Sequence, residues 1–201
     1  MNVRNLAVIP IVLAAALALS SCSESPDPAP SETEQSTPTP TPTSAEAVEQ
    51  AFAMPTDCTG LLPAGRLQAF TDQGLVLLGG PGGLSPHYYA DLTPEERAGG
   101  ISCIWGDEAV IESTVTISAA PLTASTRSTV VDDLIAQGLN EAVLDDGISY
   151  AQLGDENSAP AVLNIVRDDS WISVIEALGG ETRFNEAVQL ADEAATQTYG
   201  P

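Results

Sequence analysis

The sequence predicts an α+β domain in which helices cover one antiparallel sheet, and three observations support this. Helical and extended patterns follow one another in the order helix, strands, helix, strands, helix. Elements grouped in this way favour an α+β fold over a parallel α/β fold. Two apolar runs near the C-terminus are joined by the tight turn Asp168-Asp169-Ser170, which is typical of a hairpin.

The first elements are indicated by their turn and cap residues. We expect a short helix over residues 63–70, because it begins with a proline, which suits a first helical turn. A brief apolar strand at 74–78 then runs into a glycine-rich loop at 79–83. Thr93-Pro94-Glu95-Glu96 matches a capping box with proline at the first helical position, and Gly99-Gly100 ends that turn.

The later elements are indicated by their periodicity. Apolar residues alternate along two successive strands, first at Ile101, Cys103 and Trp105 and then at Val115, Ile117 and Ala119. We expect a helix at 125–137, strands at 148–152, 161–166 and 171–175, and a closing helix at 181–198. Trp105 shares a strand face with Cys103, so we interpret it as a core residue, and packing is also the first interpretation of Trp171.

Residues 1–21 have the composition of a lipoprotein signal peptide. Arg4 supplies positive charge, residues 6–19 are apolar, and small residues precede Cys22. As a helix the apolar run would rise about 21 Å, which is too short for a hydrocarbon core of about 30 Å. We expect cleavage before Cys22 and lipid on its sulfur, with acyl chains such as palmitate holding the protein on the outer face of the cell membrane. The alternative is an ordinary secretory signal with a chance cysteine.

Lipid on Cys22 leaves an even number of cysteines in the exported part of the chain. Cys58 and Cys103 then form a disulfide by default, as is usual for exported domains. The loop closed is about 45 residues long, for which the chain-entropy model gives about 4 kcal/mol of stabilisation. A redox pair is the alternative, although the chain has no Cys-x-x-Cys spacing.

Composition divides the rest of the chain into a linker and a domain. Residues 22–54 are mostly Ser, Thr, Pro, Glu and Ala, which favours a disordered linker that continues from the lipidated cysteine. Residues 55–201 are long enough for one extracytoplasmic domain. The net charge of −22 argues against nucleic-acid partners. The chain contains no lysine, which excludes a P-loop, a Schiff-base lysine and a Ser-x-x-Lys nucleophile.

Several short motifs resemble those of a known family. They are Cys58 with Leu61-Leu62-Pro63, Cys103-Ile104-Trp105 after a glycine-rich stretch, a turn and strand over 143–150, and a final hairpin followed by an alanine-rich helix. Together they resemble the actinobacterial lipoproteins of the DUF3558 type, and more distantly the extracytoplasmic sensor domains of mycobacterial kinases. The resemblance implies the same fold and cellular address, and it carries over only the paired cysteines. The long excursion at 79–100 departs from the usual pattern.

His87, Tyr88 and Tyr89 are the candidate recognition residues, because they lie together on a glycine-flanked loop. His87 is the only histidine and could pair with Ser85 or a distant serine, and with a carboxylate, in a hydrolase, but no Gly-x-Ser-x-Gly elbow is present. The acidic pairs at 145–146, 155–156 and 168–169 lack the spacing of a calcium loop, and such pairs also suit turns. We therefore expect no catalytic residues, metal site or cofactor.

These observations predict a membrane-anchored lipoprotein of the cell envelope with a non-enzymatic ligand-binding or protein-interaction domain. Its expected partners are the membrane, through the N-terminal lipid, and either a small apolar ligand or an envelope protein. One alternative is a cell-envelope hydrolase that uses His87. The other is a sensor or accessory domain of a membrane complex.

Overall fold

A computed structural model of the protein describes residues 51–200. The expected signal peptide, Cys22 and most of the expected linker therefore lie outside the described residues. Within the described part of the chain, no helix is both long enough and apolar enough to cross a membrane.

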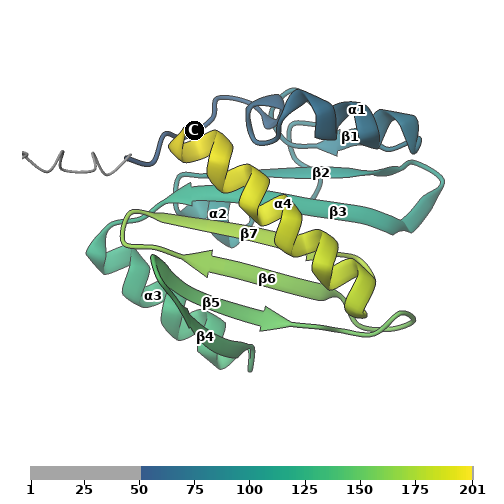
Figure 1. Ribbon diagram of the computed structural model, residues 1–201. Helices are drawn as coiled ribbons and strands as arrows, with labels where there is room; N and C mark the ends of the chain where they lie inside the picture. The colour runs from purple at the N-terminus through teal and green to yellow at the C-terminus, as the bar shows by residue number, and fades with distance from the viewer. Residues whose placement is uncertain (1–50, 201) are drawn as a thin grey trace, which may run out of the picture. The chain divides into compact units, whose positions relative to one another are not determined.

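Residues 51–200 form a seven-stranded antiparallel sheet with helices on both faces, which confirms the α+β prediction (Figure 1). The strands are β1 Val76–Gly79, β2 Ile101–Asp107, β3 Val110–Pro121, β4 Asn140–Leu144, β5 Gly147–Gln152, β6 Ala161–Val166 and β7 Ser170–Glu176. The helices are the 3-10 turn η1 Cys58–Gly60, α1 Ala64–Asp72, α2 Pro94–Arg97, α3 Ala124–Ala136 and α4 Glu181–Tyr199. The strand order is β1-β2-β3-β7-β6-β5-β4.

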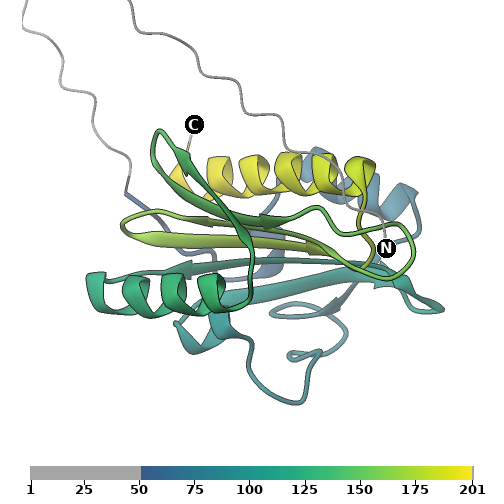
Figure 2. The ribbon, with the colours of Figure 1, turned by 90° about the horizontal axis from the view of Figure 1, so that it is seen from below.

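The larger core lies between the sheet and the layer of α1 and α4 (Figure 2). It contains the inward residues of both predicted alternations, because Cys103 pairs with Ile117 and Trp105 with Val115 in the β2–β3 register. Cys58 and Cys103 form the expected disulfide, which joins η1 to β2 and is fully buried. Trp105 packs against Phe70 of α1 with ring centroids 5.6 Å apart, so its assignment to the core beside the disulfide is confirmed.

A smaller core lies on the opposite face, under α3. Val130 and Leu134 of this helix pack against Tyr150, Val166 and Trp171 of the sheet. The next apolar residue of the helix, Ile135, is 54% exposed. Its neighbour Leu134 holds the buried position, and one residue further along a helix turns the side chain by about 100°.

Two residues that the composition places in the linker pack against the folded domain. Ala53 N donates a hydrogen bond of 2.7 Å to Thr198 O, and Phe52 packs against Tyr199 with ring centroids 5.7 Å apart. Both Phe52 and Ala53 were assigned to the linker at 22–54. They are apolar residues at the end of a polar stretch, and they contact the C-terminal end of α4.

Candidate functional site

Five buried polar side chains lie in register across the sheet on the face covered by α2 and α3. We call this set the polar row: Ser102 in β2, Ser118 in β3, Ser173 in β7, Asn164 in β6 and Tyr150 in β5. Each is directly opposite the next in the strand pairing, and none is more than 3% exposed. Residues paired in this way are the closest neighbours on one face of a sheet.

Hydrogen bonds link the members of the polar row to one another and to the elements that cover them. Ser118 Oγ donates to Ser102 Oγ at 2.8 Å, and the Ser102 and Thr93 hydroxyls are 2.7 Å apart. Asn164 Oδ1 accepts a hydrogen bond of 2.9 Å from the indole Nε1 of Trp171. A buried polar group that keeps its hydrogen bonds avoids most of its desolvation cost, so the row is stable within the fold.

The carboxyl group of Glu95 lies over this row. The expected capping box is present, with Thr93 Oγ1 accepting from Glu96 N at 3.2 Å and Thr93 N donating to Glu96 Oε2 at 2.7 Å. This cap begins α2 so that Glu95 is only 5% exposed. Burial raises the pKa of Glu95, while hydrogen bonds from Ser173 and Thr93 favour its charged form.

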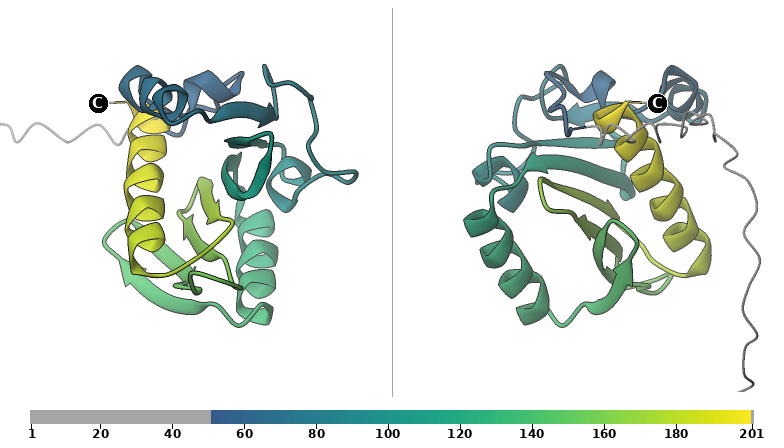
Figure 3. Two further views of the ribbon diagram at one scale, coloured as in Figure 1. Left: turned by 90° about the vertical axis from the view of Figure 1, so that its right-hand side faces the viewer. Right: turned by 60° about the vertical axis from the view of Figure 1, so that its left-hand side comes forward.

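A cavity of about 350 Å³ opens above the polar row. Its floor is formed by Thr116, Ser118, Asn164 and Ser173, and its walls by Tyr89, Leu92, Glu95, Leu134 and Trp171 among others. This volume is at the lower end of the range typical of small-molecule sites. The segment before α2 and the two helices α2 and α3 lie on this side of the sheet, opposite α4 (Figures 2 and 3).

A wider groove of about 650 Å³ lies between α2 and α3 and adjoins the cavity. The two share Pro94, Leu134, Gln137 and Trp171 in their linings. The groove also contains Arg97, whose Nη1 donates a hydrogen bond of 2.6 Å to the Leu92 carbonyl oxygen. Arg97 therefore holds the loop segment that forms one wall of the cavity.

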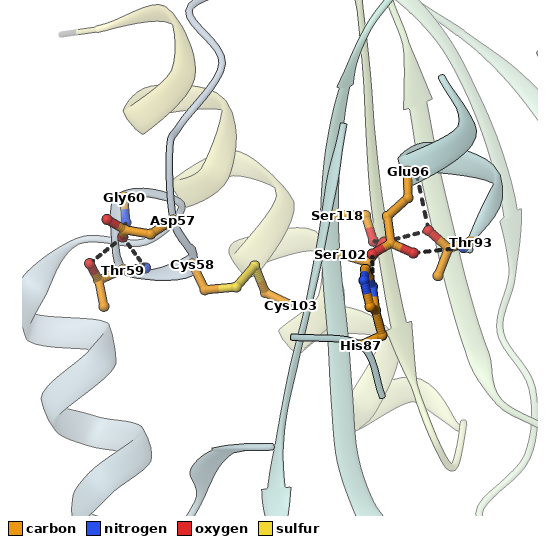
Figure 4. The surroundings of a disulfide bond; sticks show 10 residues. All are labelled: Asp57, Cys58, Thr59, Gly60, His87, Thr93, Glu96, Ser102, Cys103 and Ser118. Atoms are coloured by element: carbon orange, nitrogen blue, oxygen red, sulfur yellow. Dashed lines mark hydrogen bonds and ion pairs between the residues drawn. A yellow bond between two sulfur atoms is a disulfide. The ribbon is translucent and has the colours of Figure 1, made fainter. Parts of the chain in front are cut away.

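Of the three candidate recognition residues, only Tyr89 lines the cavity. Tyr88 packs edge-on against Tyr89, with ring centroids 5.3 Å apart, and the two residues are 41% and 52% exposed. His87 points to Glu96 instead, with Nδ1 3.5 Å from Oε1 (Figure 4). The recognition role of this loop stays a prediction, now centred on Tyr89.

Figure 4 also shows that the disulfide and Ser102, the member of the polar row in β2, lie on opposite sides of this strand. Cys103 faces η1, while the preceding residue Ser102 faces Thr93. The Ser85 hydroxyl donates to the His87 carbonyl oxygen at 2.6 Å, so it is held on the backbone rather than on the imidazole.

The acidic pairs considered for calcium form hydrogen bonds within turns or ion pairs. Asp155 accepts from the backbone of Asn157 and Ser158, and Asp146 pairs with Arg167 at 2.6 Å. No group of three His, Cys, Asp or Glu residues within the described chain is arranged to hold a metal ion. These contacts fit the interpretation of the pairs as turn residues.

Searches against protein-family models, curated proteins and solved structures find no match for this chain. The candidate site is therefore defined by its geometry alone.

The residues at the floor of the cavity were not predicted from the sequence, although a signal was present. Each of four strands carries one polar residue between two residues that point to the opposite core, as in Ile117-Ser118-Ala119 and Leu163-Asn164-Ile165.

Proposed function

We propose that the protein is a small-molecule-binding lipoprotein of the cell envelope, held to the membrane by lipid on Cys22. The observation that supports this most is the cavity whose floor includes three members of the buried polar row and whose wall carries Glu95. An apolar sheet face would pack at least as stably, because burying polar groups and a carboxyl group costs free energy. Polar groups that are buried but line a cavity are expected where a ligand must be recognised.

The cavity favours an amphipathic ligand over the purely apolar one expected from the sequence. Hydroxyl and amide groups of Ser118, Ser173 and Asn164 form the floor, so the polar end of a ligand would face the sheet. Leu92, Leu134 and Trp171 offer apolar contact for the rest of the molecule.

The test is native mass spectrometry of the full chain purified from the membranes of cells that make it. Ser118→Leu places an isobutyl group on the floor of the cavity. Thr196→Leu is the matched control, because Thr196 is exposed on α4 at the opposite face of the sheet. We expect a bound small molecule in the wild type and in Thr196→Leu, and its loss in Ser118→Leu. A ligand retained in Ser118→Leu would contradict the proposal, as would a wild type that carries none.

A cell-envelope hydrolase is the second candidate, and the His87–Glu96 pair is the observation that favours it. A carboxylate on Nδ1 is the usual way to orient a histidine that acts as a general base. Against this, the Ser85 hydroxyl is bound to a backbone carbonyl oxygen. Any esterase or peptidase activity of the full chain should disappear in His87→Ala if this candidate is right, and a retained activity would eliminate it.

A sensor or accessory role is the third candidate, and the exposed edge strand β4 favours it. All five residues of β4 are exposed, and Val143 is 80% exposed. An unpaired edge is a ready surface for another chain. Crosslinking in intact cells from a cysteine-specific probe at Val143→Cys should then capture a membrane protein. The same probe at Thr196→Cys should not.

A further inference from the structure

The charge distribution of the cavity indicates the class of its ligand. The lining contains two acidic residues, Glu95 in the wall and Asp91 on the loop before α2, and no arginine or histidine. The chain has no lysine anywhere and carries a net charge of −22. An anionic ligand would therefore meet a buried carboxyl group without any compensating cation, while a cation would be attracted by the whole protein.

The geometry of the floor adds a second argument. Asn164 Oδ1 already accepts from Trp171, so the indole fixes which way the amide points. Ser118 and Ser173 add hydroxyl oxygens beside Glu95 in the same lining. A carboxylate surrounded by hydroxyl groups suits a ligand that donates several hydrogen bonds from one positive centre. Trp171 and Tyr89 present aromatic surface to the same space, which also favours a cation.

We infer that the cavity binds an organic ammonium compound, with Glu95 as its counter-ion and the hydroxyl groups of Ser118 and Ser173 as additional acceptors. This inference rests on the proposed function, since it names the ligand class of the same cavity. Glu96, on the same helix, is the acidic group that acts on Glu95, and Asp91 on the preceding loop is the other acidic residue of the cavity lining. The residues of β3, β6, β7 and α3 that line the cavity include no ionisable group. Arg97 and Asp133 lie in the adjoining groove.

Binding of a cation must compete with the proton on Glu95. Burial raises the pKa of Glu95, and the nearby Glu96 adds to the shift, while hydrogen bonds from Ser173 and Thr93 oppose it. An ammonium ligand would favour the carboxylate and displace this proton. The affinity for a cation should therefore fall as the pH is lowered, whereas the affinity for a neutral molecule of the same shape should not.

The experiment uses isothermal titration calorimetry on the full chain with three probes of similar shape: benzylammonium, benzyl alcohol and benzoate. We expect benzylammonium to bind about tenfold more tightly than benzyl alcohol, and benzoate to bind least. Glu95→Gln should remove the preference for the cation together with its pH dependence. Glu108→Gln, which removes one exposed carboxylate from the β2–β3 turn, should keep both.

The outcomes separate this inference from the proposed function. Equal binding of benzylammonium and benzyl alcohol would overturn the ammonium inference while leaving a functional cavity. A preference for the cation that persists in Glu95→Gln would overturn the role of Glu95 as counter-ion. Binding of none of the three probes would count against the ammonium inference, and native mass spectrometry of Ser118→Leu would still test the cavity by itself.

Discussion

The indole Nε1 of Trp171 donates a hydrogen bond of 2.9 Å to Oδ1 of Asn164 on the neighbouring strand. The partner of Asn164 in the strand register is Ser173, so the indole reaches its acceptor diagonally across the β6–β7 hairpin. On its other side, Asn164 Nδ2 donates to the Tyr150 carbonyl oxygen at 3.4 Å. This one amide therefore connects the wall of the cavity to its floor.

Replacing Asn164 by alanine should destabilise the domain by roughly 1–3 kcal/mol, because the buried Trp171 Nε1 would lose its acceptor. The same replacement should cost less in a Trp171→Phe background, where no indole donor remains. Urea unfolding of the four proteins, followed by far-ultraviolet circular dichroism, gives the coupling energy. Equal costs in both backgrounds would show that the hydrogen bond contributes nothing to stability.

Removing the disulfide by Cys58→Ser with Cys103→Ser should lower the free energy of unfolding by about 4 kcal/mol, because the loop it closes spans 45 residues. Both sulfurs are fully buried, so the serine hydroxyl groups would also lose solvation. Urea midpoints of the oxidised wild type and the double variant measure the difference. A change below about 1 kcal/mol would contradict the expected contribution of this crosslink.

Alanine substitutions at Gly80 and Gly82 would distinguish the cost of backbone strain from the cost of a steric clash. Both have positive φ, at 106° and 89°, but a Cβ on Gly80 would lie 2.4 Å from Ser102 O and 2.7 Å from Cys58 Sγ, whereas one on Gly82 meets nothing. Gly82→Ala should cost about 1–2 kcal/mol for its left-handed backbone. Gly80→Ala should cost roughly 1–3 kcal/mol more, because β2 must shift. Thermal melts that rank the two variants equally would exclude the clash as a cause.

Glu176 should make the domain more stable as the pH falls from 8 to about 5. Burial raises its pKa from the ordinary value of 4.5 to about 7, Glu186 adds to the shift, and Arg183 opposes it. Between these two pKa values the folded state keeps a proton that the unfolded chain has released, so lowering the pH favours folding. Across this pH range the free energy of unfolding should rise by up to about 3 kcal/mol.

Urea unfolding at several pH values checks this expectation. Glu176→Gln should flatten the pH dependence, leaving the part due to Glu95, whose pKa burial also raises. A wild type that loses stability between pH 8 and 5.5 would show that the sign is wrong.

Local patterns predict the strands in which apolar residues recur at every second position, but they do not predict β4. Ile101, Cys103 and Trp105 alternate visibly, and all three point to the larger core. The five residues of β4 are exposed, so this strand has no apolar alternation and is formed by pairing with β5. Backbone pairing of this kind leaves little signal in the side chains.

The polar row was missed for a different reason. A serine such as Ser118 between apolar residues usually marks the solvated face of an antiparallel strand. Its burial depends on α2 and the loop before it, which cover the sheet, and on the register that aligns Ser118 with Ser102 and Ser173. Those pairings join residues far apart in the chain, so no local pattern contains them. Glu95 was noticed only as part of a capping box, which says nothing of the cavity beneath it.

The position of the disulfide determines how a pull on the N-terminal side would pass through the domain. The contacts of Phe52 and Ala53 with the end of α4 would yield first, and the load would then arrive at Cys58. From there it would cross the covalent bond to Cys103 and enter β2 directly. The chain between these cysteines, which includes α1, β1, Tyr89 and Glu95, would carry almost none of the tension. In a tethered protein the cavity wall would thus keep its shape while the domain is under mechanical load.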